Sequence, residues 1–171
     1  GYAFQNFGLT ITTASKSAFI TGTNILMVPI FLLIFRGQKV KIKVWLAIFI
    51  ATIGLYLLLD PVGGSLNTGD LLTFGCAASF ALHILLQDRY VRSGINLLRF
   101  FFIQLTTVAI VSFLSHVAFE TQPILMSPQL QTALVVTGVF ATFIGIGILV
   151  WAQKILNPSE TAIIFSMEPV F

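Results

Sequence analysis

Long apolar segments alternate with short polar ones along the whole chain. The polar separators read "RGQKVKIK", "DPVGGSLNTGD", "DRYVRSG", "ETQPILMSPQ" and "KILNPSE". A helix needs about 20 residues to cross the hydrocarbon core of a bilayer, whereas a barrel would show alternating segments of about ten. The pattern therefore predicts an all-α, polytopic transmembrane helical bundle. We expect helices at about 14–35, 42–59, 71–88, 97–119 and 130–152, with one more ending near residue 9 and another starting near residue 158.

The amino-acid composition is typical of an integral membrane protein. Hydrophobic residues make up 57% of the 171 positions and charged residues only 9%, against about 25% charged in soluble domains. The chain has 17 Phe, and its mean hydropathy is +0.98. A single soluble core could not hide so much apolar surface. We therefore expect an integral, multi-pass protein of the cell membrane, either plasma or inner, with membrane lipid covering most of it.

Basic residues collect in the loops of one predicted face. The opposite face holds only Lys16 among the basic residues, together with the acidic Asp60, Asp70 and Glu120. Because short cytoplasmic loops carry an excess of Lys and Arg, the basic face is predicted to be cytoplasmic. Charges confined to short loops also argue against a nucleic-acid partner. The basic residues of that face are Arg36, Lys39, Lys41, Lys43, Arg89, Arg92, Arg99 and Lys154.

Two helix starts resemble each other. "TTASKSAFI" near residue 13 matches "LNPSETAII" near residue 157 at an offset of 144. Five predicted helices separate the two starts, and an odd number means that the matching helices enter the membrane from opposite faces. The pattern indicates an inverted-topology repeat, and we expect the two helices to be antiparallel neighbours related by a pseudo-two-fold axis.

The same segments carry a family resemblance. "GLTITTASKSAFITGTNILMVPIF" and "PSETAIIFSMEPVF" resemble the EamA family of the drug/metabolite transporter superfamily, whose members have two homologous five-helix halves. The resemblance implies that this chain is a fragment of a ten-helix transporter: residues 1–59 would end the first repeat (helices 3–5), 60–70 would be an external linker, and 71–171 would be an incomplete second repeat (helices 6–9). It also implies a permease that moves a small organic metabolite through a cavity between the halves.

Three polar side chains fall near the predicted midplane: Asn24, His83 and Glu168. Polar residues at that depth are costly and are often functional, and inverted-repeat transporters bind their substrates there. Asn24 and Glu168 correspond at the 144-residue offset, so the two halves would place a polar group at one level. Each residue also has a structural alternative, a hydrogen bond to a neighbouring helix. All three are candidate substrate-binding residues.

Three further candidates lie toward the predicted outer mouth. Gln5 and Asn6 could line a vestibule at the end of the first helix. Lys16 occupies the first turn of a helix, where a cation opposes the helix dipole. It either extends outward to the lipid headgroups or helps to attract an anionic group of the substrate.

Other sequence features predict helix geometry. Pro29 and Pro169 each remove a helical hydrogen bond and predict kinks. "NPSE" predicts an ordinary helix start, with Asn157 as the cap and Glu160 beside the N-terminal dipole. Small residues four apart predict close helix packing at three pairs: Ala47 with Ala51, Gly75 with Ser79, and Ala141 with Gly145.

Enzyme signatures are missing from the sequence. It contains no H-E-x-x-H, no cysteine near a histidine and no phosphate-binding glycine loop, and the single Cys76 excludes an intrachain disulfide and a multi-cysteine metal site. We expect no enzyme activity, no catalytic residue, no cofactor and no metal. The expected partners are a small-molecule metabolite and lipid, with proton or ion coupling an open possibility. The alternatives are a membrane-embedded enzyme or a structural membrane protein without transport activity.

Overall fold

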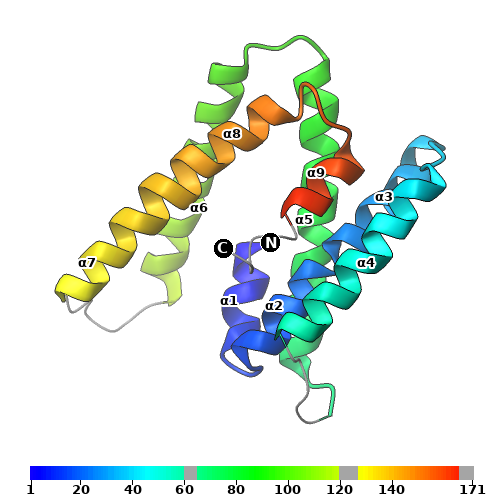
Figure 1. Cartoon of the computed structure of the whole chain (residues 1–171). Coiled ribbons are helices and arrows are strands. Elements are labelled where there is room, and N and C mark those ends of the chain that lie inside the picture. The colour runs from blue at the N-terminus through cyan, green and yellow to red at the C-terminus, as the bar shows by residue number, and fades with distance from the viewer. Residues whose placement is uncertain (60–64, 120–126, 166–171) are drawn as a thin grey trace. The chain divides into compact units, whose positions relative to one another are not determined.

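The computed structural model describes residues 1–59, 65–119 and 127–165, and its secondary structure within these ranges is helical (Figure 1). The all-helical prediction is therefore confirmed. The elements are α1 (Tyr2–Leu9), α2 (Ala14–Gly22), α3 (Asn24–Arg36), α4 (Ile42–Leu59), α5 (Thr68–Arg92), α6 (Leu97–Phe119), α7 (Pro128–Val135), the π-helical stretch η1 (Val136–Ile144), α8 (Gly145–Ala152) and α9 (Pro158–Phe165).

The helix positions follow the apolar pattern closely. Four helical segments of the described chain are long and apolar enough to cross a membrane: Ala14–Arg36, Thr68–Arg92, Leu97–Ala118 and Pro128–Ala152. A shorter apolar helix covers Ile42–Leu58. α5 is longer than its apolar stretch, because its polar first and last turns are helical too. Residues 68–70, which the sequence assigned to a linker, therefore belong to this helix.

The chain divides into two compact units, Gly1–Arg89 with Leu156–Phe171, and Tyr90–Ile155. In the first unit, α4 packs against the segment formed by α2 and α3. The rings of Phe19 and Tyr56 meet edge to face at 5.8 Å, and a Cβ at Gly22 would touch Leu55. Later residues of the first segment thus meet earlier residues of α4. The two are antiparallel neighbours.

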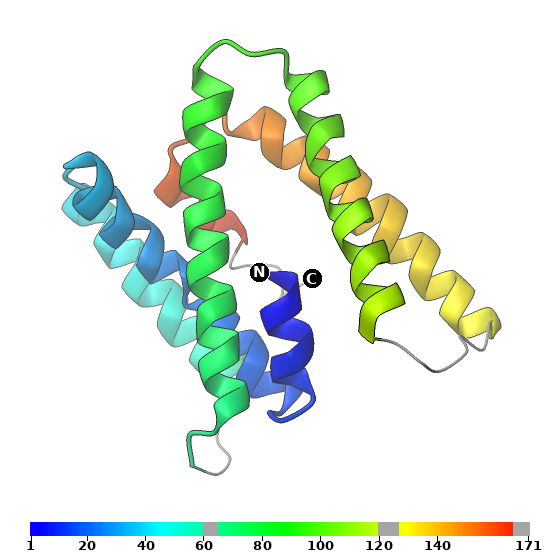
Figure 2. The ribbon, with the colours of Figure 1, turned by 180° about the vertical axis from the view of Figure 1, so that it is seen from behind.

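α1 lies antiparallel to the first half of α5 (Figure 2). Gly1 is next to Phe80, while Gly8 lies against Gly69. A Cβ on Gly69 would come within 2.8 Å of the Gly8 carbonyl oxygen and 2.9 Å of Ile11 Cβ. Only glycine permits this approach of two backbones. The closest packing is therefore at Gly8 and Gly69, whereas Gly75, which the sequence proposed as a contact, meets Phe4 at an ordinary 3.9 Å.

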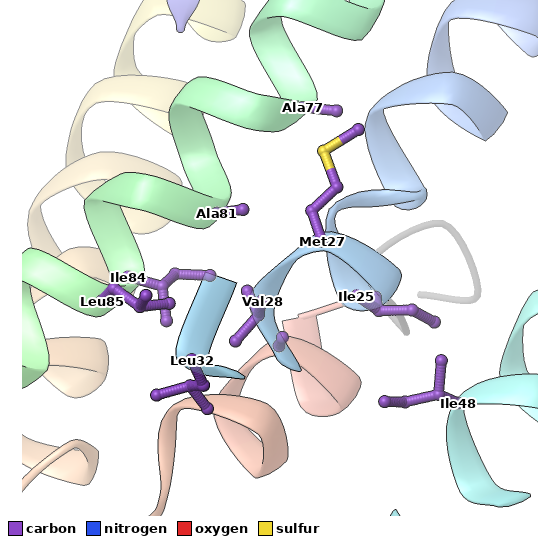
Figure 3. Close-up of a cluster of buried hydrophobic side chains, with 10 residues drawn as sticks. Ile25, Met27, Val28, Leu32, Ile48, Ala77, Ala81, Ile84 and Leu85 are labelled. Atoms are coloured by element: carbon purple, nitrogen blue, oxygen red, sulfur yellow. The ribbon is translucent and has the colours of Figure 1, made fainter. Parts of the chain in front are cut away.

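The core of this unit is formed where α3, α4, α5 and α9 meet. Figure 3 shows Ile25 and Ile48 pointing toward each other across α3 and α4, and Met27 lying beside Ala77 of α5. The alanines of α5 matter because small side chains let helices approach closely. The buried members of the cluster are Ile25, Met27, Val28, Leu32, Ile48, Ala77, Ala81, Ile84, Leu85 and Ala162.

The span from Ala14 to Arg36 is interrupted at Thr23. This residue ends α2, and its hydroxyl donates to the Ile20 carbonyl at 2.6 Å. α3 begins at the next residue and contains Pro29. The sequence predicted a kink from the proline. The break lies at Thr23, about one and two-thirds turns before it, where a threonine bonds back to its own helix, as hydroxyl residues in bent helices do.

α9 packs beside α3, with Ala162 inside the shared core. The two ribbons run in opposite directions (Figures 1 and 2). The described part of the chain thus agrees with the expectation that these repeat-related helices are antiparallel neighbours. The pseudo-two-fold axis between them stays a prediction. The kink at Pro169 lies outside the described residues.

The second unit contains α6 and the continuous segment α7, η1 and α8. Phe101 of α6 is buried against Val91 and Val150, and its ring meets that of Phe143 at 5.3 Å. Within η1 the Thr142 hydroxyl donates to the carbonyl of Thr137, five residues earlier, at 2.8 Å. That spacing fits the wider turn of a π-helix. Hydropathy predicted the extent of this span but could not distinguish an α-helix from a π-helix.

Candidate functional site

A cluster of polar groups connects the starts of α2 and α5. Lys16 Nζ lies 2.5 Å from Asp70 Oδ2 and donates to the Ser65 carbonyl at 3.2 Å. The Thr12 hydroxyl donates to Asp70 Oδ1 at 2.6 Å. Both charged side chains are almost fully buried, with exposed fractions of 11% for Lys16 and 4% for Asp70. We call these residues, together with Asn67, the Lys16–Asp70 cluster.

Asp70 also builds the beginning of its own helix. The backbone N–H of Asn67 donates to Asp70 Oδ2 at 3.0 Å, and the backbone N–H of Asp70 donates to Asn67 Oδ1 at 2.9 Å. This reciprocal pair is a capping box, and it satisfies two N–H groups that a helix start leaves open. A carboxylate there also suits the positive end of the helix dipole. The spacing "NTGD" in the sequence could have revealed it.

The position of Lys16 corrects one interpretation of the sequence. Its side chain is buried and paired, so it does not extend outward to lipid headgroups. The unfavourable interaction of a cation with the start of α2 is offset by Asp70, whose charge the sequence analysis had assigned to a loop. Hydropathy alone could not identify this partner, because it lies on another helix.

A second ion pair joins the ends of α3 and α5. Arg36 Nη1 donates to Asp88 Oδ2 at 2.6 Å, and Arg36 Nη2 donates to the Leu85 carbonyl. Asp88 is 2% exposed and Arg36 is 23% exposed. The guanidinium fork thus holds one carboxylate and one backbone carbonyl of the same helix. We call these two residues the Arg36–Asp88 pair.

Asn24 stands at the helix break, as the first residue of α3. Its Oδ1 is shielded from solvent, and no described group donates a hydrogen bond to it. An unsatisfied buried acceptor is costly, and such atoms in a native fold call for an explanation. Asn24 is the candidate whose surroundings in the described structure leave a binding group unused.

His83 lies on α5 with an exposed side chain. Gln87, one turn further along the helix, is within hydrogen-bonding reach of it and is itself buried. Residues four apart lie on the same face of a helix, so the spacing of His83 and Gln87 in the sequence could have indicated this contact.

The remaining candidates are scattered. Gln5 is half-buried and Asn6 is exposed, both on α1. Glu168 lies outside the described residues. Within residues 1–59, 65–119 and 127–165, no hydrogen bond or ion pair connects two of the candidates Gln5, Asn6, Lys16, Asn24 and His83. Their grouping into one substrate site stays a prediction.

The start of α9 has the predicted form. Pro158 opens the helix, and the backbone N–H of Asn157 donates to the Glu160 carboxylate at 3.0 Å. Glu160 is exposed and supports the helix start, which confirms its structural interpretation. Among the described residues, no group of three or more His, Cys, Asp or Glu side chains could hold a metal ion.

The sequence is similar to a known family and to a curated protein. Residues 67–171 match the family model described as "EamA-like transporter family". The whole chain is 32% identical over 173 aligned residues to a protein of Archaeoglobus fulgidus named "Uncharacterized transporter", and it spans 54% of that relative's length. No solved structure matches the chain.

Proposed function

We propose that this chain, which belongs to the EamA-like transporter family, forms part of a secondary transporter that moves a small organic metabolite across the plasma or inner membrane by alternating access. It is an integral membrane protein, and the family match favours a transporter over the alternative of a membrane-embedded enzyme. Export or facilitated exchange fits the sequence best. Because the sequence holds no ATP-binding motif, a gradient of protons, other ions or substrate would supply the energy.

The observation that carries this proposal is the Oδ1 atom of Asn24 at a helix break, to which no group among the described residues donates a hydrogen bond. Transporters with inverted repeats bind substrates near the midplane, where discontinuous helices expose polar groups. The break at Thr23 and the buried Oδ1 of Asn24 supply such a group, and α9 approaches from the matching half. An amide oxygen only accepts hydrogen bonds, so it would take a donor from the substrate, such as an amine or hydroxyl.

The other site assignments belong to the same proposal. Glu168, in the second repeat, would lie at the same depth in the membrane as Asn24, because the two residues correspond at the 144-residue offset. In an ionised form it could hold a cationic group of the substrate, and in a protonated form it could exchange a proton. Gln5, Asn6 and His83 would contribute along the substrate path. Lys16 is assigned a lesser role, because Asp70 already neutralises its charge.

The test is transport by the full-length protein in liposomes, screened over amino acids, amines, nucleosides and sugars with and without a proton gradient. Asn24→Leu removes the acceptor at similar volume. If Asn24 binds substrate, transport should fall at least tenfold while thermal stability stays equal or rises, because an unpaired polar atom has been removed. If Asn24 instead bonds a neighbouring helix, stability should fall and transport per folded molecule should stay.

A matched control is Thr107→Val. The Thr107 hydroxyl donates to the Ile103 carbonyl of its own helix at 2.7 Å, and its side chain is exposed. It is also a polar residue within an apolar span, but its hydrogen bond is already made. Transport should be unchanged in this variant, and equal losses in both variants would show that any polar change in a span is harmful.

A further inference from the structure

We propose that the α2–α3 segment and α5 stay together as one rigid body throughout the transport cycle, because an ion pair fastens them at each end. This inference rests on the proposed function, since it concerns how a transporter moves. It assigns a shared role in the transport cycle to four charged residues, Lys16, Asp70, Arg36 and Asp88.

The two ion pairs join the same two segments. Lys16 and Asp70 lie at the starts of α2 and α5, and Arg36 and Asp88 lie close to the ends of α3 and α5. The segments therefore run parallel. Along α5 the two carboxylates are about 27 Å apart at 1.5 Å per residue, close to the thickness of a bilayer core. The pairs thus hold the helices together near both membrane faces.

Packing continues between the pairs. Ser17 Oγ and Thr73 Oγ1 lie 3.5 Å apart just inside the Lys16–Asp70 cluster, and both residues are buried. Met27 and Val28 of α3 then share the buried cluster with the alanines of α5, and Leu32 continues it toward Arg36. Buried side chains of the two segments thus meet at more than one level between the two ion pairs, which opposes separation of the segments at one end alone.

Burial makes both ion pairs poor gates. A gate must open in every cycle, and opening here would remove the cation from Asp70 or Asp88, both at most 4% exposed. It would also expose the apolar contacts beside it. The movements of alternating access must then lie in other helices, or in bending at Thr23 between the two fixed ends.

The experiment bridges both ends in the same molecule. In a full-length Cys76→Ala background, Ser17→Cys with Thr73→Cys is oxidised to a disulfide, and Arg36→Cys with Asp88→Cys is bridged with a short bifunctional methanethiosulfonate. Single and double bridging are counted by intact mass. Ser17→Cys with Asp88→Cys, at opposite ends of the body, is the control and should not bridge.

A rigid body predicts that the doubly bridged fraction equals the product of the two single fractions. Two alternating gates predict mutual exclusion, in which the first bridge suppresses the second at least tenfold. Exclusion, or failure of either pair to bridge in folded protein, overturns the proposal. If the variant with Arg36→Cys and Asp88→Cys does not fold, Leu32→Cys with Leu85→Cys replaces it. This second pair lies near the same end of the segments and leaves the ion pair intact.

Mass counting needs no substrate, so this result is independent of whether the protein transports. Loss of the proposed function would appear in the liposome screen, whereas loss of this inference would appear in the bridging fractions. The proposal also predicts that doubly bridged protein transports substrate at least half as fast as unbridged protein. Transport restored only by reduction of one bridge would identify that end as a gate and overturn the proposal.

Discussion

The two ends of α5 are joined to the α2–α3 segment by different interactions. At its start, one carboxylate serves a lysine, a threonine and its own helix cap, and glycine backbones lie in direct contact nearby. At its end, one arginine holds a carboxylate and a carbonyl and keeps 23% of its side chain exposed. At the start several groups thus share one carboxylate in a network, whereas the ion pair at the end includes a partly exposed arginine.

The largest expected effect comes from Asp70→Ala. It leaves Lys16 buried with only the Ser65 carbonyl and removes one of the two hydrogen bonds of the capping box of α5, so the free energy of unfolding should fall by about 3–5 kcal/mol. Titration of SDS into detergent micelles of the full-length protein measures the change. Asp70→Asn should lose less, because its single amide oxygen can still accept from either Thr12 or Asn67. An equal loss in both variants would mean that hydrogen bonding contributes little there.

At the other end, Asp88→Asn should cost about 2–3 kcal/mol. Arg36 keeps the Leu85 carbonyl and can turn its partly exposed side chain toward water. The same SDS titration checks the value. A loss larger than that of Asp70→Ala would reverse the comparison between the two ends.

Gly69→Ala tests the backbone contact at the start of α5. The added Cβ would meet the Gly8 carbonyl oxygen and Ile11 Cβ, so we expect a loss of about 2 kcal/mol, within the range known for overpacking. Gly54→Ala in α4 is the matched control, because nothing lies within 4 Å of its added Cβ. It should stabilise the helix by about 0.5–1 kcal/mol. Two similar losses would show that the close approach is not required.

Exchanging the charges gives the smallest and most discriminating effect. Arg36→Asp with Asp88→Arg should recover about 1 kcal/mol of the loss seen with Asp88→Arg alone, because the pair can reform. Lys16→Asp with Asp70→Lys should recover less, since a lysine cannot accept from Thr12 or Asn67. Unfolding of the four single and two double variants tests this, and equal recovery at both ends would contradict the distinction between network and pair.

How much the sequence could predict depends on whether a feature is local. The extents of α4 and α6 and the starts of α2 and α9 follow from apolar runs and capping residues, and they were predicted correctly. The capping box at Asn67 and Asp70 was also readable, as an Asn three residues before an Asp. The break at Thr23 was not predicted, because hydropathy does not report how a hydroxyl bonds to its own helix. The kink at Pro29 stays a prediction.

The ion pairs could not be predicted in the same way. Counting helices shows that Lys16 and Asp70 reach the same membrane face, but which helices are neighbours depends on packing between alanines and branched side chains in the core. Asn24 illustrates the same limit for the candidate site. Its depth was apparent from residue counts, whereas its unused acceptor depends on every group that surrounds it.

The ion pairs also have a consequence for biogenesis. Thr12 and Asp70 are separated by 58 residues, and Arg36 and Asp88 by 52. At ribosomal rates of roughly 5–20 residues per second, the partners in α5 are synthesised roughly 3–12 s after the groups they join. During that interval Lys16 and Arg36 must remain at the membrane surface or beside the insertion machinery. The arrival of α5 would then complete insertion of the earlier helices as well as its own.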